Sequence, residues 1–81
     1  MKITYDETKR QTNIEKHGFD FADLDMLFFA ESVIVPAKDN RLMAIGVFRD
    51  GVIAVVFVTL GSEAISVISM RKASRKERTI L

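Results

Sequence analysis

The chain has 81 residues, of which 48% are apolar and 28% are charged, and this is typical of one small globular domain covering residues 1–81. It has no cysteine and a single histidine, so disulfides, thiolate zinc sites and multi-histidine metal sites are excluded. The net charge is only +1, and by itself it indicates no class of partner. The first residues lack the apolar core of a signal peptide, and the longest apolar run, Val52 to Val58, is too short to cross a membrane. We therefore expect a cytoplasmic protein that makes no membrane contact.

The first five residues alternate apolar and polar side chains, which predicts a short edge strand. Asp6 then has the properties of a helix N-cap, and Gly18 those of the residue that ends the helix. At helical spacing, one side of the helix between them carries four polar or basic side chains, Lys9, Asn13, Lys16 and His17.

A second helix is predicted to begin after an N-cap at Asp20 and to end near Ala30. Phe19 and Leu24 flank its start in the pattern of a hydrophobic staple. Its apolar residues recur at steps of three, three and one, which predicts a buried stripe of Phe21, Leu24, Leu27 and Phe28.

The part of the chain after the second helix is predicted to form strands, beginning with the short β-branched segment Ser32 to Val35. Short turns at Asp50-Gly51 and Leu60 to Glu63 then separate three longer strands, Leu42 to Arg49, Val52 to Thr59 and Ala64 to Met70. Ser74 and Glu77 have the spacing of a capping box, so a short C-terminal helix is expected up to about Ile80. The predicted fold class is α+β, with two N-terminal helices packed on an antiparallel β-meander.

Both alternating faces of Val52 to Thr59 are apolar, whereas a sheet with one wet face would alternate apolar and polar residues. The two N-terminal helices can cover one face, but the short C-terminal helix can hardly cover the other. Two explanations are open: a partner or a second copy of the chain covers the rest, or small side chains and loops suffice.

Charge is distributed unevenly along the chain. Glu77 is the one acid within a basic C-terminal cluster of Arg71, Lys72, Arg75, Lys76 and Arg78. Such a cluster at a strand-to-helix junction can bind phosphates, or it can be a solvated chain end. The predicted second helix carries the opposite charge, with Asp20, Asp23, Asp25 and Glu31, which helix capping explains better than a metal site.

Two side chains stand out for chemistry. Strand alternation predicts that Arg71 ends a row formed by Ile65, Val67 and Ser69. Its guanidinium can clamp a phosphate there, or its stem can cover the core while its head reaches water. His17 is the side chain best suited to proton transfer near neutral pH, but for a single histidine a place at a helix C-terminus is the commoner explanation.

Three motifs in series resemble those of the BrnT-type toxins. Asn13 to Phe19 is similar to the Asn-x-x-Lys-His-Gly-(apolar) signature of that family, and Asp6 and Lys9 fit the start that precedes it. Arg41 to Gly46 looks like the family's Arg-x-x-x-Ile-Gly strand. Ile68 to Arg78 looks like its Ile-Ser-x-Arg-x-Ala-(Thr/Ser)-x-x-Glu-Arg ending. Phe21, Ala22 and Phe28 fit the helix between these motifs, so the resemblance spans nearly the whole chain.

This resemblance implies a RelE-like fold and a ribonuclease toxin of a type II toxin–antitoxin system. It implies neutralisation by a BrnA-type antitoxin with a ribbon-helix-helix part, and contact with operator DNA only through that complex. A homodimer is a further expected assembly. We expect RNA cleavage through attack of a 2′-hydroxyl on the adjacent phosphate, with no metal and no cofactor.

The expected catalytic residues are His17 as base or acid, Lys16 or Glu77 as its opposite, and Arg71 as the group that stabilises the phosphate. Contacts to RNA phosphates are expected from Lys9, Arg41, Ser69, Lys72, Arg75 and Arg78. The alternative function is that of a catalytically degenerate toxin homologue, which binds an antitoxin and helps to regulate its operon. A dimer unrelated to toxicity is the third hypothesis.

Overall fold

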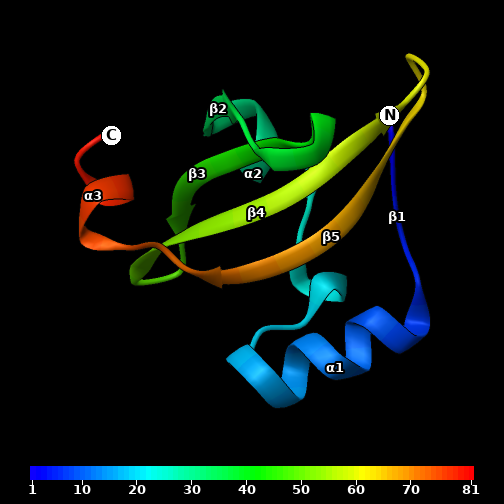
Figure 1. Cartoon of the computed structure of the whole chain (residues 1–81), viewed down its shortest axis with the longest axis horizontal. Helices are drawn as coiled ribbons and strands as arrows, with labels where there is room; N and C mark the ends of the chain where they lie inside the picture. The colour runs from blue at the N-terminus through cyan, green and yellow to red at the C-terminus, as the bar shows by residue number, and fades with distance from the viewer.

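The computed structural model describes all 81 residues, as a five-stranded sheet in the order β1-β5-β4-β3-β2 with three α-helices (Figure 1). Along the chain the elements are β1 (Lys2–Tyr5), α1 (Glu7–His17), the 3-10 turn η1 (Phe21–Asp23), α2 (Met26–Glu31), β2 (Val33–Pro36), the 3-10 turn η2 (Lys38–Asn40), β3 (Leu42–Phe48), β4 (Gly51–Leu60), β5 (Ala64–Lys72) and α3 (Arg75–Arg78). The α+β class is therefore as predicted. No helix has the length and hydropathy needed to cross a membrane.

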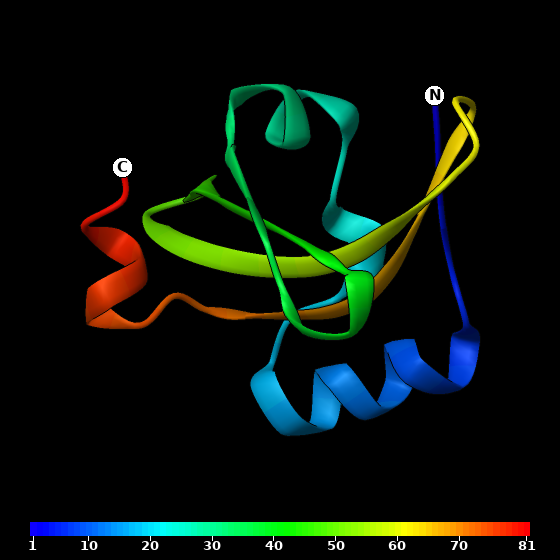
Figure 2. The ribbon, with the colours of Figure 1, turned by 45° about the horizontal axis from the view of Figure 1, so that its top comes forward.

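The predicted antiparallel meander is confirmed as β3, β4 and β5, and β2 extends it with another antiparallel pairing. The predicted edge strand β1 is also present, but it runs parallel to β5, pairing Lys2 with Ala64 and Tyr5 with Val67. The sheet is therefore mixed. In both views α1 lies beside β5, and β2 is at the other end of the strand order (Figures 1 and 2).

The first helix matches its prediction at both ends. The Asp6 carboxylate accepts hydrogen bonds from the backbone N–H groups of Thr8 and Lys9, at 2.7 and 3.1 Å. Gly18 adopts a left-handed conformation with φ 76°, and its N–H donates to the carbonyl of Ile14. That conformation carries a steric penalty for other residues, so a glycine defines where α1 stops.

The predicted second helix is wrong as one continuous element. Asp20 does cap a helix, because it accepts from the N–H of Ala22, but that helix is only the 3-10 turn η1. Leu24 and Asp25 are then extended, and Asp25 starts α2 by accepting from the N–H of Phe28. Two capping residues within six positions thus divide the segment.

The break in the second helix also changes which side chains it buries. Leu27, predicted to be buried, is 63% exposed, whereas Phe29 takes its place in the core. η1 and α2 bring Phe21 and Phe29 onto one face of the sheet, where Phe29 makes an edge-to-face contact with Phe57 at 5.2 Å between ring centroids. Val55 and Val67 complete the centre of this core face without any solvent exposure.

The turn predicted between β3 and β4 is displaced by one residue. Phe48 pairs with Gly51, so the two turn residues are Arg49 and Asp50 and not Asp50 and Gly51. Arg49 has a φ of 57°, an unfavourable region for arginine. Its guanidinium lies 4.8 Å from the ring centroid of Phe48 and 3.2 Å from the Asp23 carboxylate, and these contacts help to hold it there.

A β-bulge in β5 overturns the predicted face of Arg71. Val56 pairs with Ser69 but the next residue, Phe57, pairs with Val67, so Ile68 is an extra residue in β5. Beyond this bulge the alternation is reversed. Ser69 and Arg71 therefore lie on the face opposite to Ile65 and Val67, and Met70 joins the core instead.

We call the face that carries Ser69 and Arg71 the second face of the sheet. Its centre is covered, because Ile45 and Ala54 have no solvent exposure. Arg71 pairs in register with Ala54 and reaches across to Met43, with Nη2 3.9 Å from the sulfur. Val47, on the same face, stays 68% exposed. The chain thus covers one part of this face itself and leaves another part open.

The buried side chain of Asn13 joins α1 to the sheet. β1 pairs only with Ala64 to Val67, so the outer edge of β5 has no strand partner beyond Val67. Asn13 fills this position. Its Oδ1 accepts from the N–H of Met70 at 3.0 Å, and its Nδ2 donates to the carbonyls of Met70 and Phe19, both at 2.9 Å. One amide therefore satisfies three backbone groups, two of which belong to the free edge of the strand.

Replacing Asn13 should destabilise the fold far more than replacing an exposed neighbour. Asn13→Ala leaves the N–H and carbonyl of Met70 buried without partners, so the free energy of unfolding should fall by about 2–4 kcal/mol. Urea unfolding followed by circular dichroism measures this loss. Gln11→Ala, on an exposed position of α1, is the control and should change stability by less than about 0.5 kcal/mol. Equal stability of the two variants would contradict the assigned role.

Gly46 is needed where β3 passes under the end of α2. A Cβ atom at this position would clash with Ser32 Oγ, and it would lie 3.1 Å from Phe28 Cε1 and 3.2 Å from Ser32 Cβ. The Ser32 hydroxyl cannot easily move, because it donates to the carbonyl of Phe28 at 2.6 Å.

Gly46→Ala should therefore lower the free energy of unfolding by about 1–3 kcal/mol through overpacking. Adding Ser32→Ala removes the hydroxyl that the new methyl group meets, so the double variant should be more stable than Gly46→Ala alone. Urea unfolding of wild type, of both single variants and of the double variant completes a double-mutant cycle. Additive losses would exclude this contact as the cause.

Candidate active site

Six of the ten expected site residues, namely Lys9, Lys16, His17, Arg41, Ser69 and Arg71, line two shallow depressions. The first, which we call the α1 depression, has a volume of about 250 Å³ and lies between α1 and β5. It is lined by Thr8, Lys9, Thr12, Asn13, Lys16, His17, Ile68 and Ser69. The predicted grouping of Lys9, Lys16 and His17 on one side of the helix is thus confirmed, and the β5 bulge brings Ser69 to them.

The second depression, the β2–β3 depression, is larger, at about 630 Å³. Its lining comes from the β2–β3 connection and the second face of the sheet, and consists of Pro36, Ala37, Lys38, Arg41, Met43, Val56 and Arg71. Neither lining includes a carboxylate, whereas together they hold five lysine or arginine side chains and the histidine. Both depressions therefore suit an anion.

The two depressions adjoin each other on the sheet. Val56 lines the β2–β3 depression, and its register partner Ser69 lines the α1 depression. Directly opposed side chains on neighbouring strands lie only about 5 Å apart and point to the same face. A chain-like ligand can therefore enter both depressions at once.

Arg71 is held by Glu77, the acid of the basic C-terminal segment. The guanidinium donates from Nη1 and Nη2 to the two carboxylate oxygens, at 2.7 and 2.9 Å. Glu77 also completes the predicted capping box of α3, accepting from the N–H of Ser74 at 2.9 Å. The hydrogen bonds from Arg71 and then those from Ser74 lower the pKa of Glu77 to about 2, and the carboxylate raises the pKa of Arg71. Both groups are charged at neutral pH.

Three of the basic residues expected to bind phosphate lie outside both depressions. Lys72 lies at the end of β5, in a separate hollow beside Phe48 and the Arg49-Asp50 turn. Arg75 and Arg78 are exposed on α3, which spans only Arg75–Arg78 and is two residues shorter than predicted. The basic C-terminal cluster therefore does not gather at one place.

Residues 5–77 match the sequence profile of a family described as the ribonuclease toxin BrnT of type II toxin–antitoxin systems. The crystal structure of the ribonuclease toxin BrnT from Brucella abortus matches the present fold with a TM-score of 0.87 and 60% sequence identity, over 93% of this chain and 99% of that one. The chain belongs to the BrnT family. None of the curated proteins compared with it matches.

The resemblance read from the three motifs is thereby confirmed, and the structure gives physical reasons for several residues of this BrnT-family chain. Asn13 supports the edge of β5, Gly18 ends α1, and Gly46 makes room for Ser32. Much of the family pattern thus describes packing and backbone geometry. Other residues of the motifs line the two depressions instead, and they are Lys9, Lys16, His17, Arg41, Ser69 and Arg71.

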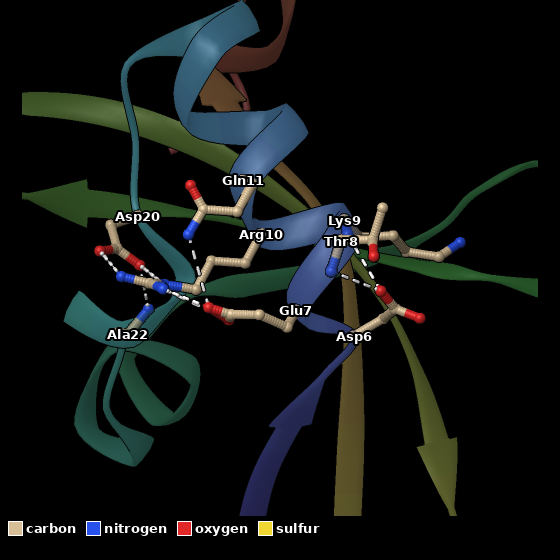
Figure 3. A network of polar contacts seen from close by, with 8 residues as sticks. All are labelled: Asp6, Glu7, Thr8, Lys9, Arg10, Gln11, Asp20 and Ala22. Carbon is tan, nitrogen blue, oxygen red and sulfur yellow. Dashed lines mark hydrogen bonds and ion pairs between the residues drawn. The ribbon is translucent and has the colours of Figure 1, made fainter.

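Sequence analysis missed an ion-pair network that joins α1 to the segment before η1 (Figure 3). The guanidinium of Arg10 lies between Glu7 and Asp20, and it binds Asp20 with both Nε and Nη2, at 2.7 and 2.8 Å. These bonds lower the pKa of Asp20 to about 2. The pair lies ten residues apart across the Gly18 break, so helical spacing alone could not indicate it. Its effect is to fix the chain between α1 and η1.

Lys38, Thr8 and Thr12 were also missed as lining residues. Thr8 and Thr12 share the i, i+4 spacing of the basic residues on α1, and that spacing could have indicated them. Lys38 lies in a loop, where no periodicity predicts the direction of a side chain.

No group of three or more histidine, cysteine, aspartate or glutamate side chains has the arrangement of a metal site.

The Arg71–Glu77 pair predicts how stability depends on pH. The folded pKa of Glu77 is lowered from its usual 4.5 to about 2, so the pair stabilises the fold fully above pH 4.5. This stabilisation is lost as the pH falls towards 2. The difference in unfolding free energy between wild type and Glu77→Gln should therefore shrink as the pH is lowered from 5 to 2, in urea titrations.

Glu63→Gln is the control for this experiment, because Glu63 is exposed in the β4–β5 turn and its side chain forms no ion pair. Its difference from wild type should stay near zero throughout. A Glu77→Gln difference that persists unchanged at pH 2 would refute the importance of this ion pair.

Proposed function

We propose that the chain is a ribonuclease toxin that cleaves RNA without a metal, through attack of a 2′-hydroxyl on the adjacent phosphate. The 2′-oxygen forms a bond to phosphorus, the bond to the 5′-oxygen breaks, and the products are a cyclic phosphate and a 5′-hydroxyl. This chemistry needs a base, an acid and positive charge at the phosphate. The observation that carries the proposal is the α1 depression of a BrnT-family chain, where His17, Lys9 and Lys16 meet without any carboxylate.

We assign proton transfer to His17, which lies half-buried at the last position of α1. Lys16 is its proposed partner, because it is next in the helix and lines the same depression. One of the two takes the proton from the 2′-hydroxyl and the other donates a proton to the leaving 5′-oxygen. Lys9 and the hydroxyl of Ser69 would hold the phosphate between them.

We assign charge stabilisation to Arg71, whose side chain is 34% exposed and lines the β2–β3 depression, two residues after Ser69 of the α1 depression. Nη1 and Nη2 bind Glu77, and they also contact the carbonyl of Lys72 and the sulfur of Met43, so the phosphate would be met by Nε. Glu77 was expected to be an acid or base, but a carboxyl with a pKa of about 2 carries no proton to donate near neutral pH. We therefore propose that Glu77 is a positioning residue for Arg71.

The proposed partner is a BrnA-type ribbon-helix-helix antitoxin, with operator DNA bound only by the complex. Membership of a toxin–antitoxin family supports an antitoxin in general. The exposed part of the second face, with Val47 and Val33, is apolar surface that such a partner or a second copy could cover. We further propose that residues 1–81 act as one domain of RelE-like type, which the meander and its helices support.

One contact favours the alternative function, that of a degenerate homologue acting through antitoxin binding and operon regulation. The guanidinium expected to take a phosphate already holds the carboxylate of Glu77. In the alternative, this ion pair serves only to fasten α3 to the sheet.

Inducible expression in a bacterium distinguishes the two functions. Wild type should arrest growth with loss of intact RNA, and Arg71→Ala and His17→Ala should each relieve the arrest and slow RNA cleavage by about a hundredfold or more. Arg49→Ala is the matched control, because this arginine lies in the β3–β4 turn outside both depressions. Normal growth and intact RNA with soluble, folded wild type would refute the ribonuclease and favour the binding function.

A further inference from the structure

We propose that the β2–β3 depression binds one unpaired nucleotide of single-stranded RNA, next to the phosphate that is cleaved in the α1 depression. The proposal rests on the ribonuclease function above and adds the form of the substrate. It also assigns a role to Lys38, Met43 and Val56, which neither the motifs nor the proposed chemistry uses.

The lining of this depression combines cations with an apolar floor. Lys38 and Arg41 come from the β2–β3 connection and Arg71 from β5, and Met43 and Val56 lie between them on the sheet. A nucleotide needs both features, because its phosphate is an anion and its base has flat apolar faces. A thioether packs well against an aromatic ring, and a guanidinium plane can stack on it. The volume of about 630 Å³ is within the range of small-ligand sites.

The wall of the depression is a tight loop of fixed geometry. Asp39 and Asn40 both have positive φ values, of 59° and 61°, which aspartate and asparagine tolerate better than most residues. The N–H of Ala37 donates to the carbonyl of Arg41 at 2.8 Å, and the N–H of Arg41 donates to that of Lys38 at 3.2 Å. Lys38 and Arg41 are therefore placed on one rim of the depression before any ligand binds.

The neighbouring α1 depression determines which nucleotide is held. The pairing of Val56 with Ser69 joins the two floors, so a strand with a phosphate beside His17 and Ser69 continues directly into the β2–β3 depression. A duplex keeps its bases paired and stacked inside, whereas an unpaired nucleotide can turn its base into a pocket. The geometry therefore favours a flexible single strand over a duplex.

Binding can be measured separately from cleavage with a fluorescent 2′-O-methyl RNA hexamer, which lacks the attacking hydroxyl. Lys38→Ala and Arg41→Ala should each weaken binding by about tenfold, the loss expected for one charge-assisted contact. The slope of log affinity against log salt should fall by about 0.7 for each phosphate contact removed. Lys2→Ala and Arg49→Ala remove exposed cations elsewhere and should bind as wild type does.

A second measurement tests the apolar floor. A hexamer with one abasic position should bind wild type more weakly than the complete hexamer does, and Met43→Ala should abolish that difference. Circular dichroism and thermal unfolding of each variant check that the fold is retained. Equal binding of both hexamers by wild type would show that no base is held and would overturn the proposal.

Three other outcomes would also overturn it. In the first, wild type does not bind the hexamer. In the second, Lys38→Ala and Arg41→Ala bind the hexamer as tightly as wild type does. In the third, an RNA duplex or a polyglutamate peptide of equal charge binds as tightly as the hexamer, and this binding also depends on Lys38. Cleavage of unmodified RNA, assayed in parallel, tests the proposed function by itself. Lys38-dependent hexamer binding without cleavage by wild type would refute the ribonuclease and leave the nucleotide site standing.

Discussion

The hydrogen bonds of Asn13 determine where the parts of this molecule lie. β5 is more than twice as long as β1, so the sheet would end in unpaired backbone groups on the side that faces α1. A buried N–H or carbonyl without a partner costs about 1–3 kcal/mol, which is a large share of the stability of so small a protein. The Asn13 amide completes the edge as a short strand would, and it can do so only if α1 lies against β5. The position of the helix therefore follows from the unequal lengths of two strands.

That arrangement has a direct effect on the surface. Because Asn13 faces the sheet, the residues one turn before it and one turn after it also face the sheet at its border. They are Lys9, Lys16 and His17, and they form one wall of the α1 depression. The same backbone contact that completes the fold thus places the histidine beside β5. Arg10, three residues before Asn13 on α1, ties the helix independently to the segment before η1 through Asp20, and it also binds Glu7 (Figure 3).

Sequence patterns predicted the elements that depend on local chemistry. The caps at Asp6, Gly18 and Ser74 were correct, since each acts through groups a few residues away. The three strands of the meander were correct because both their turns and their apolar character are visible in the sequence. The errors have a different origin. The second helix failed because Asp25 competes with Asp20 as a cap, and the outcome depended on how the phenylalanines pack.

The site was predictable in part for the same reason. Helical spacing brought Lys9, Lys16 and His17 together correctly, because a single helix carries them. The prediction of the face on which Arg71 lies was wrong. The bulge at Ile68 is defined only by the pairing with β4, and no local sequence pattern indicates it. The β2–β3 depression could not be predicted, since its lining comes from segments that meet only in the folded sheet.

The bulge at Ile68 has a further consequence for how this chain can vary. Ile68 is the extra residue, so without it Val67 and Ser69 would be neighbours in a regular strand with the same partners on β4. Ser69 and Arg71 would then keep the second face, and Met70 would stay in the core. Loss of the bulge at the present strand length would have the opposite effect, because it would turn Ser69 and Arg71 towards the phenylalanine core. A relative that is one residue shorter at this point can therefore present the same side chains from a regular strand, whereas a relative of the same length needs the bulge.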